Sequence, residues 1–164
     1  MADPSSAGPD RASRFWWRWK VLAGSGLIFF VFQHFLTLST NPGWLAVPLL
    51  LAQGIVVVGG LLTLWHAYLL AGSGNKNGSA KQLVCSGGLY PLVRHPMYLG
   101  DMVLYLGLAL LAPGWGSGIC LLLGWSALIL QARAEDAYLS ARFGSDFDAW
   151  ASRTGRILPI ARKL

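Results

Sequence analysis

The chain has 164 residues, of which 54% are hydrophobic and only 12% are charged. Soluble domains normally carry about 25% charged residues, yet no Asp, Glu, Lys or Arg occurs from Val21 to Asn75 or from Met102 to Ala132. Apolar runs of this length indicate a single-domain membrane protein and exclude an ordinary soluble core. The net charge of +6 does not indicate nucleic-acid binding, because the basic residues gather at the ends of the apolar runs.

The N-terminal part of the chain predicts a tail followed by a first membrane helix. Residues 1–13 are polar, so we expect a disordered tail there and one membrane domain over 14–164. Basic and aromatic side chains alternate between Arg14 and Lys20, a pattern typical of a membrane–water interface. The apolar run that follows predicts a transmembrane helix over 21–38, and it lacks the cleavage site of a signal peptide.

A second, longer helix is predicted after a turn at Asn41-Pro42-Gly43. It covers residues 44–70 and is about 40 Å long, so it must tilt or extend beyond the hydrocarbon. Its glycines permit close contact with another helix, either within the chain or in a dimer, and the oligomeric state stays open. A polar loop over 71–86 follows.

Two shorter helices are predicted over 96–111 and 115–131. Each is near or below the ~17 residues that a membrane span requires, so the pair either crosses or enters and returns. The segment 133–150 has apolar residues at helical spacing and predicts an amphipathic helix on the membrane surface. The predicted fold is an all-α integral membrane protein with about four transmembrane helices and a cytoplasmic C-terminal amphipathic helix.

The distribution of basic residues predicts the orientation of these helices. All 13 Lys and Arg residues lie before Val21, between Lys76 and Arg94, or from Arg133 onward, and the predicted turns at 41–43 and 112–114 hold none. Loops rich in Lys and Arg stay in the cytoplasm. We therefore expect both termini to be cytoplasmic, in a cell inner membrane.

Polar residues of unusual kind gather where the helix over 96–111 begins. Pro96 suits the first turn of a helix, which places His95 near the N-cap and Arg94 just before it. The first-turn amides then lack intrahelical partners and, with the helix dipole, form a site for an anion. These amides belong to Met97, Tyr98 and Leu99.

Asp101 shares a helical face with Tyr98 and Tyr105. An ionisable residue inside a membrane helix is a candidate for function. The alternative is a structural ion pair with Arg94 or Arg133, and both interpretations stay open. The roles of His34, inside the first predicted helix, and of His66, near the end of the second, also stay open.

A helical hairpin brings Arg133-Ala134-Glu135-Asp136 back beside the start of the helix over 96–111. A carboxylate ligand would suit that helix start, while an amine or sulfonium would suit Glu135 and the rings of Tyr90 or Tyr98. The alternative is that these charges only fix the helix ends at the membrane boundary. The two cysteines have no metal-ligand spacing, and we expect no metal.

The segment from Gly88 to Gly100 resembles the RHPxYxG signature of the isoprenylcysteine carboxyl methyltransferase family, which is related to membrane phospholipid N-methyltransferases. The segment Arg133–Asp136 is similar to that family's R-x-E-E element. Residues Arg142–Trp150 and Arg156–Pro159 are similar to its FGxxYxxY and RxxP tail. The resemblance covers about half of the chain and is closest to prokaryotic-type members, although Asp136 replaces the second Glu of the acidic pair.

The resemblance implies a cytoplasm-facing site for the cofactor S-adenosyl-L-methionine. The residues that it implies for cofactor contact are Lys81, Gln82, Leu83, Val84, Tyr90, His95, Pro96, Met97, Tyr98 and Glu135. It places Arg133 on the substrate side. We expect Arg133 and Arg94 to orient an anionic acceptor, and Glu135 or Asp136 to accept a proton if the acceptor is an amine.

The expected activity is methyl transfer to a lipophilic carboxylate, thiol or amine that enters from the bilayer. The acceptor itself stays open, and membrane lipids are the expected partners. A non-catalytic accessory protein would not need Arg94, His95, Tyr98 and Glu135 together. A small transporter would need more polar residues along a path than Gln33 and His34 provide.

Overall fold

The computed structural model describes residues 11–37, 46–72 and 87–159. The expected disorder over most of the N-terminal tail, the turn at 41–43 and nearly all of the loop over 71–86 lie outside these residues. Within them, the chain is helical apart from turns and one isolated parallel bridge between Val93 and Gly155. The all-α prediction is confirmed.

Five helices form the described part of the chain. They are α1 (Arg11–Thr37), α2 (Ala46–Gly72), α4 (Pro96–Leu111), α5 (Trp115–Phe143) and α6 (Ser145–Ala151).

The sequence predicts the bounds of α4 correctly, but not those of α1. Pro96 occupies the first turn of α4 and His95 is its N-cap residue, as expected. By contrast, α1 begins at Arg11, ten residues before the predicted start at residue 21. The interfacial segment before Val21 is polar, but it contains no Gly or Pro that would interrupt a helix.

The predicted break between a membrane helix ending at residue 131 and a tail helix starting at 133 is wrong. Helix α5 continues through both positions to Phe143 and has 29 residues, which makes it about 43 Å long. Charged residues signal that a helix leaves the hydrocarbon, but they do not end it. Gly144 does end it, with a φ of 55° that favours glycine.

Three of these helices, α1, α2 and α5, are long and apolar enough to cross a membrane. Many of their large apolar side chains are exposed, as in Phe29, Leu61 and Leu122, which suits contact with lipid. The protein is therefore an integral membrane protein. Helix α4 has 16 residues and is about 24 Å long, shorter than the ~30 Å hydrocarbon core, so a fourth span stays a prediction.

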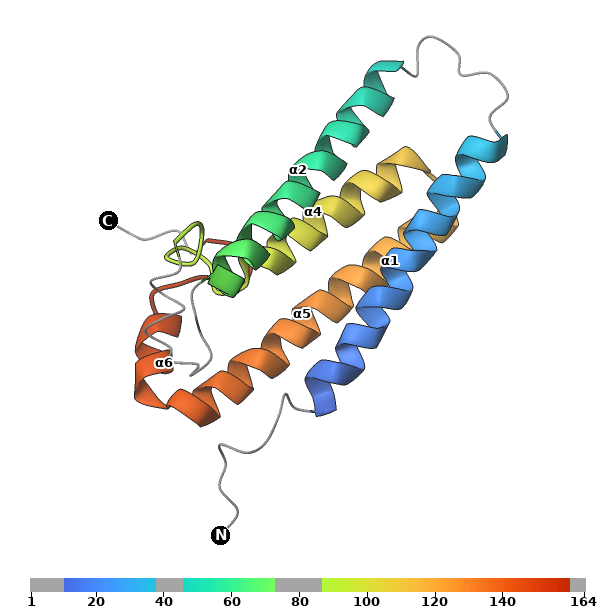
Figure 1. Ribbon diagram of the computed structural model, residues 1–164. Coiled ribbons are helices and arrows are strands. Elements are labelled where there is room, and N and C mark those ends of the chain that lie inside the picture. The colour runs from blue at the N-terminus through green and yellow to red at the C-terminus, as the bar shows by residue number, and fades with distance from the viewer. Residues whose placement is uncertain (1–10, 38–45, 73–86, 160–164) are drawn as a thin grey trace.

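The long helices form two antiparallel pairs, α2 with α4 and α1 with α5 (Figure 1). Glycines allow the first pair to approach closely. A Cβ atom on Gly59 would collide with the backbone of Leu104, and one on Gly100 or Gly107 would collide with α2. Backbones in such contact bring the polar start of α4 close to the end of α2.

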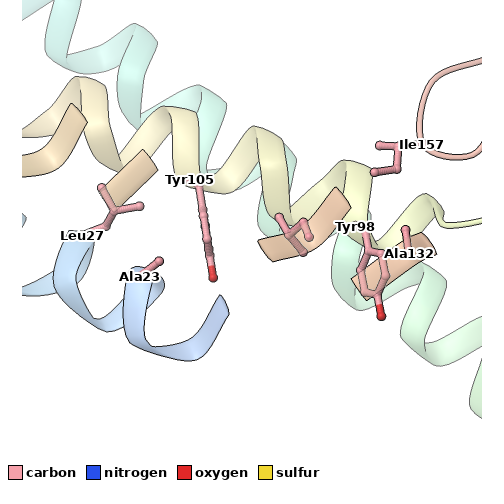
Figure 2. Packing of buried hydrophobic residues seen from close by; sticks show 7 residues of the cluster. Ala23, Leu27, Tyr98, Tyr105, Ala132 and Ile157 are labelled. Atoms are coloured by element: carbon pink, nitrogen blue, oxygen red, sulfur yellow. The ribbon is translucent and has the colours of Figure 1, made fainter. Parts of the chain in front are cut away.

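Tyr105 joins the two pairs. Its side chain points from α4 toward α1, near Ala23 and Leu27 (Figure 2). Its hydroxyl donates a hydrogen bond of 2.8 Å to the carbonyl oxygen of Lys20, and its ring fills the space beside Gly124 of α5. The buried core therefore connects α1, α4 and α5 at this level.

Candidate functional site

The C-terminal segment lies against the residues that precede α4. The amide of Arg94 donates to the carbonyl oxygen of Gly155 at 2.8 Å, and the amide of Gly155 donates to Leu92 at 2.9 Å. The amide of His95 donates to the carbonyl oxygen of Arg156 at 3.0 Å. These backbone bonds hold the tail beside the start of α4.

Asp136 is the centre of a buried ionic cluster at this junction. Its carboxylate accepts hydrogen bonds from Arg94 Nη2 at 3.0 Å, Arg156 Nε at 2.7 Å and His95 Nε2 at 2.8 Å. Only 11% of its side chain is exposed. One carboxylate thus joins three elements: the loop before α4, helix α5 and the tail.

The guanidinium of Arg94 is engaged on several sides. Besides Asp136, it donates from Nη1 to the carbonyl oxygens of Ala151 and Thr154, both at 2.6 Å. These carbonyls lie at the end of α6, where a positive charge is favourable. The geometry therefore supports a role in holding the fold together more than the expected role of orienting an acceptor.

A pocket of about 250 Å³ lies beside this cluster, where α2, α4, α5 and α6 meet. Its walls are mainly apolar and aromatic, with a single carboxylate from Glu135. The lining residues are Leu70, Tyr90, Arg94, His95, Pro96, Met97, Tyr98, Glu135, Leu139 and Trp150.

Glu135 and the rings of His95 and Tyr98 form one wall of the pocket. The Tyr98 hydroxyl donates to Glu135 Oε1 at 2.6 Å, and the two rings are stacked with centroids 5.3 Å apart. His95 Nδ1 lies 3.6 Å from Glu135 Oε2. With 32% of its side chain exposed, Glu135 can also meet a ligand.

Two buried polar atoms, one on α5 and one on α6, have no hydrogen-bond partner among the described residues. They are Trp150 Nε1 and Gln131 Oε1. The amide nitrogen of Gln131 donates to Glu135 Oε1 at 3.2 Å, which leaves its oxygen without a donor. Unsatisfied buried groups are costly.

Tyr90 reaches the pocket through a turn fixed by His66 of α2. Gly87 and Gly88 have φ values of 80° and 60°, and the next amide, of Leu89, donates to His66 Nε2 at 3.0 Å. A Cβ atom on Gly88 would lie 2.8 Å from the same nitrogen. His66 is thus a structural residue, and this glycine allows close approach to α2.

Burial raises the pKa of the Tyr90 hydroxyl. The hydroxyl therefore stays protonated at physiological pH. The Tyr90 ring packs edge-on against His66, with centroids 5.8 Å apart, and offers the pocket a neutral aromatic surface.

The expected set of three unpaired amides at the start of α4 is wrong. The amides of Tyr98 and Leu99 donate to the carbonyl oxygen of His95 at 3.1 and 3.2 Å. The N-cap carbonyl accepts both because it turns into the helix. Of the three amides, only that of Met97 makes no such bond to His95. This helix start is therefore a weaker anion site than predicted.

The structure brings most of the predicted site residues together, but not all of them. Arg133 is exposed on α5 and does not line the pocket. Residues 81–84, expected to contact the cofactor, lie outside the described residues. Asp101 pairs with Lys20 at 3.2 Å, and not with either arginine considered from the sequence.

Sequence reasoning missed several residues of this region. Leu70, Leu139 and Trp150 line the pocket, and they resemble ordinary apolar positions in a pattern. One feature of the sequence could have pointed to Lys20: it is the last charged residue before a long uncharged run. Arg156 lies in the tail motif, but its contact with Asp136 depends on long-range backbone pairing.

A sequence model described as phospholipid methyltransferase matches residues 47–146. Among curated proteins, the chain is similar to steroid 5-alpha-reductase DET2 of Solanum lycopersicum, with 29% identity over 96 residues. That match covers 57% of this chain and 37% of the relative, so the chain spans well under half of the curated relative's length. No solved structure matches the chain.

Proposed function

This chain belongs to the phospholipid methyltransferase family, whose sequence model covers residues 47–146, and we propose that it transfers a methyl group from S-adenosyl-L-methionine to a lipid acceptor. The proposed site is the pocket at the start of α4. By the positive-inside rule, this end of the bundle faces the cytoplasm.

The residues of the pocket fit much of the cofactor. Glu135 suits the positive sulfonium and amino groups, and the rings of Tyr90 and Tyr98 suit a cation or the adenine. Trp150 adds to the aromatic lining of the pocket. The amide of Met97 provides a hydrogen-bond donor.

When bound, S-adenosyl-L-methionine would supply its sulfonium methyl group to the lone pair of the acceptor, and the thioether sulfur would leave with the C–S electron pair. The protein must align the two reactants and exclude water. The ionic cluster around Asp136 fixes His95 and the start of α4. Tyr98 holds the carboxylate of Glu135 in place through a hydrogen bond of 2.6 Å.

The charges around the pocket favour an amine as the acceptor. Glu135 would repel an acceptor carboxylate, whereas Arg94 and Arg156 already bind Asp136. An amine must be neutral to attack, and its proton is lost as the N–C bond forms. We assign the carboxylate of Glu135 as the group that receives this proton, since it lines the pocket.

The convergence of Glu135, His95 and Tyr98 on one pocket carries this proposal. The direct test is calorimetric binding of S-adenosylhomocysteine to detergent-purified protein. We expect micromolar binding by the wild type and at least tenfold weaker binding by Glu135→Gln, which keeps the shape and removes the charge. Asp146→Asn, on the exposed start of α6, is the matched control and should bind like the wild type.

Two outcomes would contradict the proposal. A folded, monodisperse wild type that does not bind S-adenosylhomocysteine would favour an accessory protein that retains the fold. Reduction of a steroid by the purified protein would favour the chemistry named for the steroid reductase relative.

A further inference from the structure

Lys20 lies where the polar and apolar parts of the membrane meet. It ends the basic and aromatic segment of α1, and no charged residue follows it until Lys76. Lipid phosphates lie at this boundary, where cationic side chains attract them. The level of Lys20 is therefore the level at which a phospholipid presents its headgroup.

The side chain of Lys20 turns into the helix bundle and not only toward lipid. Its ammonium lies 3.2 Å from Asp101 Oδ2, and Asp101 Oδ1 accepts a hydrogen bond of 3.0 Å from Thr63. The Lys20 side chain is 18% exposed. A cation this enclosed in a membrane helix is costly and suggests function.

Lys20 is also next to the proposed reaction site. Its ammonium lies 5.3 Å from the centroid of the Tyr98 ring, and the hydroxyl of the same ring is 2.6 Å from Glu135 Oε1. One tyrosine thus has a cation against its ring and a carboxylate at its hydroxyl. A phospholipid amine headgroup carries the complementary pair, a phosphate and an amine separated by a short linker.

We infer that Lys20 binds the phosphate of the phospholipid acceptor while Glu135 meets its amine. This inference rests on the proposed function and assigns a specificity residue in α1, outside the residues that the family model matches. An ammonium group has three N–H donors, and among the described residues only Asp101 accepts one. Asp101 therefore orients Lys20 and leaves it capacity for a phosphate oxygen.

The test compares an amine acceptor that carries a phosphate with one that does not. Wild type and Lys20→Met are assayed with phosphatidylethanolamine and with a long-chain primary alkylamine, both in mixed micelles. We expect the substitution to raise KM for phosphatidylethanolamine about tenfold or more, because a charge-assisted hydrogen bond is lost. KM for the alkylamine and the affinity for S-adenosylhomocysteine should stay within about twofold of the wild-type values, because neither depends on a contact with phosphate.

Lys20→Arg should restore most of the selectivity, because it keeps the charge. Arg18→Met, at an exposed position of the same helix, is the control and should match the wild type. Lys20→Met keeps the hydrogen bond from Tyr105 to the backbone of residue 20, but it leaves the carboxylate of Asp101 without its cation. The double variant Lys20→Met/Asp101→Asn removes that unpaired charge and should show the same selective rise in KM.

Three results separate the possible failures. Equal losses with both acceptors would make Lys20 a structural residue and overturn the inference. No change with either acceptor would overturn it as well. A wild type that methylates neither acceptor would instead overturn the proposed function, and the inference with it.

Discussion

Glu135 and Asp136 are adjacent carboxylates of α5 with different surroundings. Asp136 is bound by two arginines and a histidine, whereas Glu135 lines the pocket and is bound by Tyr98. The family resemblance treats the two as one acidic pair. In the structure, Asp136 holds three elements of the fold together, whereas Glu135 lines the pocket.

Removing Asp136 should therefore affect stability more than any change at Glu135. Asp136→Ala leaves Arg94 and Arg156 buried or half-buried without their anion, which typically costs about 3–5 kcal/mol. Glu135→Gln should change stability by less than about 1 kcal/mol. Thermal unfolding of both variants in the same detergent provides the measurement, and equal losses would contradict the division of roles.

Residue patterns predicted part of this site. A proline after a polar segment placed His95 at the start of α4, and the hairpin topology brought Glu135 back to it. The pairing of Asp101 with Lys20 could not be predicted, because it depends on how α1 packs across α4. The hydrogen bonds of Arg94 could not be predicted either, because the carbonyl groups that accept them belong to a tail more than 55 residues away.

At the scale of elements, helix lengths were harder to predict than helix positions. Apolar runs located α1, α2, α4 and α5, because an apolar segment in lipid satisfies its backbone polar groups by forming a helix. The same runs gave wrong ends for α1 and α5, since both helices continue into polar sequence. Breaks follow from glycine and proline, as Gly144 and Pro96 show, and not from the appearance of charge.

Close contact between α2 and α4 predicts different effects at two adjacent glycines. Gly59→Ala places a methyl group against the backbone of Leu104, and overpacking of this kind typically costs about 1–3 kcal/mol. A Cβ atom on Gly60 meets nothing within 4 Å, so Gly60→Ala should keep or raise the melting temperature. Similar melting temperatures for the two variants would show that the helices are not in backbone contact.

At the scale of the whole molecule, the position of every Lys and Arg predicts which ends of the helices face the cytoplasm. In a variant without Cys85 and Cys120, we expect Gly114→Cys to react with a membrane-impermeant maleimide in intact cells. Ser152→Cys should react only after permeabilisation. Both positions are exposed, and the reverse labelling pattern would contradict a cytoplasmic site.

The whole molecule places a lipid-facing bundle next to a polar site at one end. Exposed apolar faces suit contact with the bilayer, while Trp150 of α6 lines the pocket beside the start of α4. The sequence alone predicted this division, because charge-free runs and charged segments are well separated along the chain. The wall formed by Trp150 depends on the break at Gly144, which turns α6 back toward α4.

The most direct test follows the methyl group itself. Membranes that contain the protein are incubated with S-adenosyl-L-methionine labelled in its methyl group, and the lipid extract is counted. We expect label in an amine-bearing phospholipid with the wild type, and at least a hundredfold less with Glu135→Gln at an equal amount of folded protein. Lipid label that does not exceed that of membranes lacking the protein would contradict the account.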